Sequence, residues 1–539
     1  MRRKGTSWIV RSKALKAREQ SFVMSGEMPE TPLALAESQV TSRVVPTTGR
    51  PVRGSHNESI NLGSILMLLA MLVPIIAAVL AASGFRGRDE LLGMDVGTSY
   101  SAVAVRRGAG GIVTIVKGEG GASVPSVVAL GDSGEWLVGS AAEAVLRVAP
   151  ARGVVDGKRV IGRFADDAMV AMEAPRHAGR LLTHPAARRS RSSGRAITTS
   201  KAIAACSLNT TDCCQDLAFA LSLEGLSSSA RATAARHICV DTGAAVDTRS
   251  PPRGWRDASA LNLLPGGPHF LLLTPQAITC AIAHALKMRA AVDIGHTSAR
   301  KVMAATPADF SGTQREATME GFMRAGLAVV RLLHEPTAAA LAYGLHRTPN
   351  VHTVLVFDMG GGTLDVSVLY ASEGSFTVVG TAGDNGLGGE DVDDCVAAAL
   401  KATASYVTKT NAYKDKAACS AARLSAEAER VKIALSGDGG EGAASAVAWS
   451  CGHLRGVLSA VQFNERCAAT LDRAMLPVRE ALARAALTPD EIDEVVLVGG
   501  SSRLPLIRTR LSVEFGGRVL RTSVDPDLAV ALGAAKSGD

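Results

Sequence analysis

Hydrophobic positions form the same pattern at two places in the chain, a pair of apolar strands joined by a glycine turn. In "VFDMGGGTLDVSVLY", residues 356–370, an apolar run reaches Asp358 and an alternating run follows the glycines. Residues 91–105, "LLGMDVGTSYSAVAV", repeat this design with Asp95 before the turn and Thr98 within it. Period-two alternation is typical of strands, so both segments predict β-hairpins, one in each half of the chain.

Three consecutive glycines interrupt the second hairpin at residues 360–362, although glycine weakens a strand. A tight turn that needs positive φ is one explanation. Alternatively, their N–H groups form an anion-binding concavity, to which Thr363 adds a hydroxyl. The flanking carboxylates of Asp358 and Asp365 would repel a bare phosphate but suit hydrated Mg²⁺. Two such turns that face each other across a cleft favour the polyphosphate interpretation.

A third glycine turn, "VVLVGGSSRLP" at residues 495–505, follows a continuous apolar run and predicts a strand-to-helix turn. Such a turn directs free N–H groups and the helix dipole at a ligand, and Arg503 could lie over a flat ring. The nearest approach to a Walker A motif, "GVVDGKR" at 153–159, has the wrong spacing, so the sequence contains no Walker A motif. No G-x-G-x-x-G fingerprint lies in a βαβ setting, which argues against dinucleotide binding.

Residues 62–82 form an apolar stretch inside a charge-free run from Ser59 to Phe85. At about 1.5 Å per residue such a helix crosses a bilayer, although a buried helix of a soluble domain is the alternative. The preceding residues 1–60 carry ten Lys/Arg and five Asp/Glu. The positive-inside rule therefore predicts a cytosolic tail, with everything after about residue 85 across the membrane. A cleaved signal peptide remains the other interpretation of the same run.

Composition adds little to this picture. The net charge of +7 in 539 residues resides mostly in the basic tail, so we expect no nucleic-acid partner. The nine cysteines include no CxxC pair and no metal-ligand spacing. Those within residues 206–239 are interpreted as small buried side chains, or as a disulfide if the domain is extracytoplasmic. Asn209 begins a glycosylation sequon.

Several ordered segments resemble the nucleotide-binding domain of the 70-kDa heat-shock proteins. They are "GMDVGTSYS", "GVVDGKRVIGR", "LLHEPTAAALAYG", "VFDMGGGTLDVS", "TAGDNGLGGEDVD", "VVLVGGSSRLP" and "SVDPDLAVALGAA", and together they cover about residues 90–180 and 270–537. The resemblance implies an α/β, actin-like ATPase fold with two lobes. Each lobe would hold an RNase-H-like sheet with helices, and the nucleotide would lie in the central cleft.

The resemblance also assigns chemistry. Asp95, Asp358 and Asp365 would hold Mg²⁺, mostly through water. Lys158 would stabilise charge on the γ-phosphate and orient the attacking water, with Glu335, Asp358 and Thr363 as further catalytic groups. ATP or ADP, with K⁺ as an additional ion, would contact Gly97, Thr98, Ser99, Tyr100, Gly360, Gly361, Gly362, Gly388, Gly389, Glu390, Glu429, Lys432, Ser436, Gly499, Gly500, Ser501, Arg503 and Asp527.

The sequence departs from the family pattern at four places. Ile433 replaces an arginine that stacks on adenine, a contact worth about 0.5–2 kcal/mol. Residues 306–312, "TPADFSG", replace a family segment that ends in tyrosine, phenylalanine, asparagine and aspartate. Residues 180–270 have the composition of a loop and are interpreted as an insertion. The chain ends at "LGAAKSGD", where the family continues into a linker and a peptide-binding domain.

These features lead us to expect a basic disordered tail at 1–60, a membrane or signal-anchor segment at 61–85 and an ATPase domain at 86–539. The whole resembles a microsome-associated family member that consists of the ATPase core alone. We expect a slow ATPase at the endoplasmic reticulum membrane that assists protein folding with co-chaperone or nucleotide-exchange partners and has no peptide site of its own. The alternatives are a nucleotide-dependent scaffold and a small-molecule kinase, for which we find no substrate-pocket motif.

Overall fold

The computed structural model describes residues 67, 70–76, 78–79, 90–108, 111–118, 120–163, 167–173, 181–183, 217–222, 226–227, 229–230, 234, 245–246, 270–295, 299–406, 419–437 and 442–538. The tail expected at 1–60 lies outside these residues. Within 61–85 the described residues are helical, and no helix of the described chain is long and apolar enough to cross a bilayer. Residues 77–539 form one compact unit, to which every sheet below belongs.

The first half of this unit, lobe I, is built around a mixed six-stranded sheet with the order β13-β12-β1-β2-β3, in which β4 also pairs with β2. β1, β2 and β3 form an antiparallel meander, and β12 and β13 extend it in parallel. The predicted hairpin at 91–105 is the β1–β2 pair. The strands are β1 (Leu91–Val96), β2 (Tyr100–Arg107), β3 (Ile112–Ile115), β4 (Ser123–Pro125), β12 (Lys301–Thr306) and β13 (Ala328–His334).

The second half, lobe II, repeats this topology in a five-stranded sheet with the order β16-β15-β14-β20-β21. The first three strands again form an antiparallel meander, and β20 and β21 add in parallel. The strands are β14 (Thr353–Met359), β15 (Leu364–Ser372), β16 (Ser375–Asp384), β20 (Glu494–Val498) and β21 (Leu520–Arg521). The predicted two-lobed α/β fold with similar sheets is therefore confirmed.

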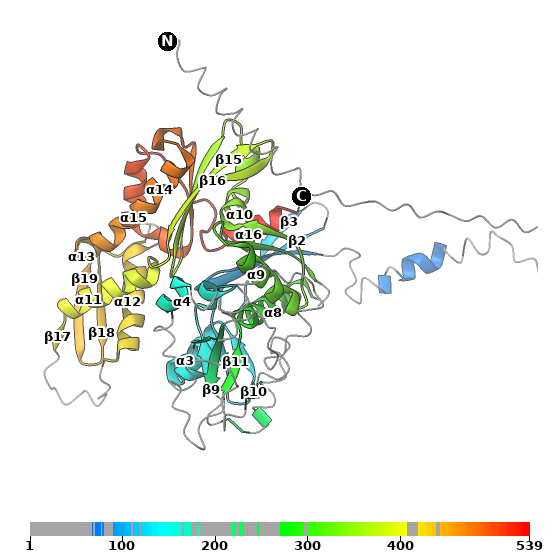
Figure 1. Ribbon diagram of the computed structural model, residues 1–539, viewed down its shortest axis with the longest axis horizontal. Coiled ribbons are helices and arrows are strands. Elements are labelled where there is room, and N and C mark those ends of the chain that lie inside the picture. The colour runs from blue at the N-terminus through cyan, green and yellow to red at the C-terminus, as the bar shows by residue number, and fades with distance from the viewer. Residues whose placement is uncertain are drawn as a thin grey trace, which may run out of the picture. The chain divides into compact units, whose positions relative to one another are not determined.

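Two helices, α10 (Glu335–Ala342) and α16 (Ala529–Lys536), pack against each other between the two sheets (Figure 1). Their packing is close, because a Cβ at Gly533 would collide with the backbone of Ala338. One hydrophobic cluster contains side chains from both sheets and both helices, including Met303 of lobe I and Val356 of lobe II. The two lobes therefore share part of their hydrophobic core.

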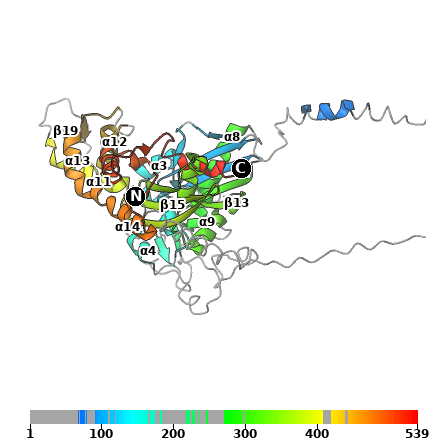
Figure 2. The ribbon, with the colours of Figure 1, turned by 90° about the horizontal axis from the view of Figure 1, so that it is seen from above.

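Each lobe also carries outer elements, several of which are labelled in Figure 2. In lobe I these include α8 (Pro275–Ile294), α9 (Gly312–Arg324), α3 (Ser140–Val148) and the sheet β6-β5-β7 (Trp136–Val138, Val128–Leu130, Gly153–Val154). In lobe II they are α11 (Gly389–Ala402), α12 (Ala421–Ser436), α13 (Ala460–Asp472), α14 (Met475–Ala485) and the sheet β17-β19-β18 (Ser405–Tyr406, Leu454–Ser459, Ala446–Cys451).

Part of the stretch that we expected to be loop, residues 180–270, forms strands instead. β8 (Leu181–Thr183), β9 (Leu217–Ser222) and β10 (Ala245–Val246) pair in one sheet with β11 (Phe270–Leu273). β9 buries Leu217, Phe219 and Leu221 on one face. The alternating apolar residues of "LAFALS" therefore form a strand although the composition around them is polar.

Two disulfides lie in the outer part of lobe II. Cys395 of α11 is bonded to Cys467 of α13, and Cys419, which precedes α12, is bonded to Cys451 of β18. Cys280 of α8 is disulfide-bonded as well. The spacing of the cysteines along the chain predicted neither lobe II pair. A disulfide within residues 206–239 would fall outside the described residues.

Candidate nucleotide site

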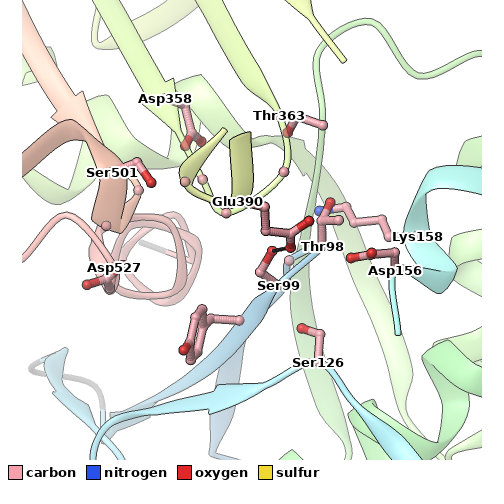
Figure 3. Close-up of a pocket in the computed structure, with 18 of the residues that line it drawn as sticks. Thr98, Ser99, Ser126, Asp156, Lys158, Asp358, Thr363, Glu390, Ser501 and Asp527 are labelled. Atoms are coloured by element: carbon pink, nitrogen blue, oxygen red, sulfur yellow. Dashed lines mark hydrogen bonds between the residues drawn. The ribbon is translucent and has the colours of Figure 1, made fainter. Parts of the chain in front are cut away.

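A cavity of about 610 Å³ lies between the two lobes, and the three glycine turns predicted from the sequence open onto it (Figure 3). Every residue that we assigned to the site lines this cavity except Gly388. Gly388 lies behind the wall, where a Cβ would collide with the Gly361 backbone. The structure therefore places the assigned segments around one cavity, although they lie up to about 430 positions apart in the chain.

The two hairpin turns touch each other across the cavity. Ser99 in the β1–β2 turn donates to Glu390 at the start of α11, at 3.4 Å (Figure 3). Its side chain also fills the space that a Cβ at Gly361 would need. The Glu390 amide donates to the Gly361 carbonyl at 2.7 Å, which fixes α11 onto the β14–β15 turn. Glycine at 361 is thus required by the close approach of lobe I.

The third turn follows β20 and forms another wall. Gly499 adopts φ 77°, a conformation that favours glycine, beside the backbone of Met359. Arg503 donates to Asp525 at 2.5 Å and to Asp527 at 3.3 Å. We predicted Arg503 as a contact for a flat ring. Its guanidinium lines the cavity in this ion-paired position.

Lys158 and Glu335 form the central ion pair of lobe I, with Lys158 Nζ 2.7 Å from Glu335 Oε1. Lys158 lies in a short 3₁₀ helix, Gly157–Val160, and Glu335 begins α10. Burial disfavours the Lys158 ammonium, but Glu335 and Asp95 outweigh it and raise the Lys158 pKa. Both side chains are almost fully buried, so each charge depends on the other.

The carboxylates assigned to magnesium have strongly perturbed acidity. Burial and then the Glu335 charge raise the pKa of Asp95 to about 7. Burial and then Asp309 raise the pKa of Asp365 to about 7, and burial with Glu335 raises that of Asp358 well above its usual value. These carboxylates repel one another, a cost that a nearby cation relieves.

The donor set fits hydrated Mg²⁺ better than a directly ligated metal. Among the described residues, no three Asp, Glu, His or Cys side chains are grouped closely enough to hold a metal ion directly. Asp95 Oδ1 is buried and, within the described part of the chain, has no hydrogen-bond partner. Mg²⁺ retains several water molecules, and these could bridge the remaining distance to Asp95, Asp358 and Asp365.

Helix α12 forms the wall assigned to adenosine. Lys432 Nζ donates to Asp393 at 2.8 Å and to the Gly389 carbonyl at 3.0 Å, so it fastens α12 to α11. Ser436 donates to the Lys432 carbonyl at 2.7 Å. Ile433 lines the cavity with 58% of its surface exposed, which provides an apolar face where the family pattern has an arginine.

Motif reasoning left several residues of the cavity wall unassigned, among them Asp309 and Arg159. Asp309 lies in the divergent segment 306–312 and adds a carboxylate beside Asp365. Arg159 follows Lys158 directly and is 7% exposed. The sequence offered one signal for it, a second basic residue in "DGKRVIGR", which we attributed to the lysine motif alone.

Comparison with protein families gives a match to the model described as Hsp70 protein, over residues 91–208 and 267–539. The match continues through residues 180–208, where we expected the family pattern to be lost, and the unmatched residues 209–266 lie in the rest of that stretch. Members of this family bind ATP and ADP with Mg²⁺, hydrolyse ATP and interact with co-chaperones. The expectation of an ATPase core without a peptide-binding domain stays a prediction. Because the match covers most of the chain and agrees with the two-lobed fold and its cavity, the chain belongs to the Hsp70 family.

Proposed function

We propose that this protein is a slow ATPase that hydrolyses ATP to ADP and phosphate and serves as the nucleotide-driven part of a chaperone. The observation that supports this most is the cavity between the lobes, in which glycine turns from both lobes meet and which Lys158 and Glu335 also line. Backbone N–H groups of these turns would hold the phosphates, as they do in other anion-binding concavities.

In this mechanism Lys158 stabilises negative charge that develops on the terminal phosphate, and Glu335 holds the ammonium in place. When bound, Mg²⁺ would neutralise part of the phosphate charge. Asp95, Asp358 and Asp365 would hold its water molecules. Thr363 hydrogen-bonds to Asp365 and presents its hydroxyl to the cavity, where it can orient the attacking water.

The alternative is a scaffold that binds nucleotide without hydrolysing it, which the apolar Ile433 favours because it removes a contact to the base. Single-turnover hydrolysis by the full-length chain with Mg²⁺, together with equilibrium binding of ATP, separates the two. Phosphate release at a rate above solution background supports the ATPase. Binding of ATP without phosphate release would overturn it in favour of the scaffold.

We further propose that the ATPase domain lies in the lumen of the endoplasmic reticulum and is held there by residues 62–82. The basic residues before this run support that orientation. The disulfides of lobe II also support it, since cytosolic proteins rarely retain such bonds. In sealed microsomes the domain should resist added protease until detergent is present. Digestion without detergent would contradict the luminal position.

A further inference from the structure

Arg159 spans the cleft between the lobes. It belongs to the same 3₁₀ helix of lobe I as Lys158, and its side chain is 3% exposed. Nη1 donates to Glu173 of lobe I at 3.3 Å and to the Asn385 carbonyl, which follows β16 of lobe II, at 2.9 Å. One nitrogen of the guanidinium therefore joins the two lobes at the edge of the nucleotide cavity.

The other two nitrogens are unsatisfied. Arg159 Nε and Nη2 are buried and have no hydrogen-bond partner in the part of the chain that the structure describes. Buried donors without acceptors are rare in native proteins, particularly when they carry charge. Because the side chain lines the cavity, these donors point to an acceptor that belongs to a ligand.

The guanidinium lies against the glycine turn of lobe II. A Cβ at Gly362 would collide with Arg159 Nη2, so glycine is needed there for the arginine to approach. Gly362 immediately precedes Thr363, in the turn to which the proposed function assigns the phosphates. The unsatisfied edge of Arg159 therefore lies against the turn that would hold the phosphates.

The two unsatisfied donors of Arg159, Nε and Nη2, indicate which kind of ligand would fit. Nε–H and Nη2–H form the side-on fork of a guanidinium, which matches two oxygens of a phosphate or carboxylate. Lys158 is already paired with Glu335, and Asp95, Asp309, Asp358 and Asp365 are among the other carboxylates that line the same cavity. A phosphate that enters these acidic surroundings binds more favourably when a second positive charge faces it.

We propose that Arg159 binds the terminal phosphate of ATP through Nε and Nη2 and links its presence to contact between the lobes through Nη1. This inference rests on the proposed ATP-binding function. Arg159 would make this contact with the γ-phosphate and with the phosphate released from it, and none with ADP. It would therefore contribute both to selectivity for ATP and to stabilisation of the charge that develops during hydrolysis.

The test compares ATP and ADP, with full-length Arg159→Gln and Arg159→Lys variants. We expect either substitution to weaken ATP binding about tenfold, to leave ADP binding within about twofold, and to slow single-turnover hydrolysis by about 100-fold or more. Arg159→Lys keeps a buried cation but loses the fork, so it shows the same selectivity even if the glutamine variant folds poorly. Arg479→Gln, which alters an exposed arginine paired with Glu514, should change none of these values.

If Arg159 only joined the two lobes and bound no phosphate, the variants would give a different result. Glu173→Gln weakens the Nη1 contact and leaves Nε and Nη2 in place. If Arg159→Gln and Glu173→Gln reduce ATP and ADP affinity equally, or if neither Arg159 variant distinguishes ATP from ADP, the phosphate role is wrong. Wild-type protein that binds neither nucleotide would instead overturn the proposed function itself, and the inference with it.

Discussion

At the scale of single residues, Lys158 offers the sharpest test of the catalytic assignment. Lys158→Ala removes a charge that we place next to the transferred phosphate, while the glycine turns that hold ATP remain. We expect hydrolysis to fall about 100-fold or more and ATP binding to stay measurable, because the contact strengthens in the transition state. Single-turnover rates and equilibrium binding would be measured side by side. An equal loss of both would make Lys158 an anchor for the bound substrate.

The residues that sequence analysis found and missed differ in how their roles are encoded. Asp95 and Thr98 lie in a strand–glycine–strand pattern that itself indicates phosphate binding, and Lys158 was assigned through the resemblance of "GVVDGKRVIGR" to the family. The role of Arg159 depends on Asn385 and Gly362, which belong to the opposite lobe. No local pattern carries that information, because the contact exists only after the two lobes have packed together.

At the scale of elements, Asp393 of α11 predicts a pH-dependent stability. Burial raises the pKa of the Asp393 carboxyl to about 6, although the neighbouring Lys432 acts to lower it. The folded state therefore keeps a proton that the unfolded chain releases. This contribution to the free energy of unfolding is fully present below about pH 4 and is lost as the pH rises through about 6.

Asp393→Asn removes this titration and leaves an amide next to Lys432. We expect the wild type to lose on the order of 2 kcal/mol of stability relative to the variant between about pH 4 and pH 7. Urea unfolding at several pH values measures the difference. Asp394→Asn removes a neighbouring charge that helps to raise the Asp393 pKa, so it should reduce this pH-dependent loss of stability. A pH-independent difference for Asp393→Asn would contradict the assignment.

The two lobe II disulfides cross-link elements at and beside α12, the helix that forms the wall assigned to adenosine. The Cys395–Cys467 bond closes a loop of 72 residues and ties α11, which begins at the phosphate turn, to α13. Replacing both cysteines with alanine should lower the free energy of unfolding by about 2–4 kcal/mol. Denaturant unfolding with and without reductant measures this. Reductant should destabilise the wild type more than the variant, and equal stability of the two proteins under oxidising conditions would disprove the prediction.

Elements differed in how well hydrophobic pattern alone predicted them. The hairpins β1–β2 and β14–β15 and the turn after β20 were predictable, because each combines apolar periodicity with glycine at a fixed place. Strand β9 was missed, since its six residues lie in a polar, loop-like surrounding. The cysteine pairs of lobe II were not predictable either, because the partners come from separate elements that meet only in the fold.

At the scale of the whole molecule, the two lobes share the core formed by α10, α16 and both sheets. The nucleotide cavity lies between the same lobes, with walls from both. A ligand in this cavity therefore adds contacts across the cleft to those already made by the core. This arrangement predicts that the lobes unfold together and that nucleotide stabilises them as a unit.

Calorimetric unfolding of the full-length chain tests this coupling. Because ligand binds only the folded state, MgATP at about 100 times its dissociation constant should add about 2.7 kcal/mol to the free energy of unfolding. We expect the transition of the ATPase domain to move to higher temperature as a single peak. Removal of Mg²⁺ with a chelator should reverse most of the shift, since the acidic cluster at Asp95, Asp358 and Asp365 then repels the phosphates. Two separate peaks, of which nucleotide shifts only one, would mean that the ligand contacts a single lobe and that the cavity does not couple them.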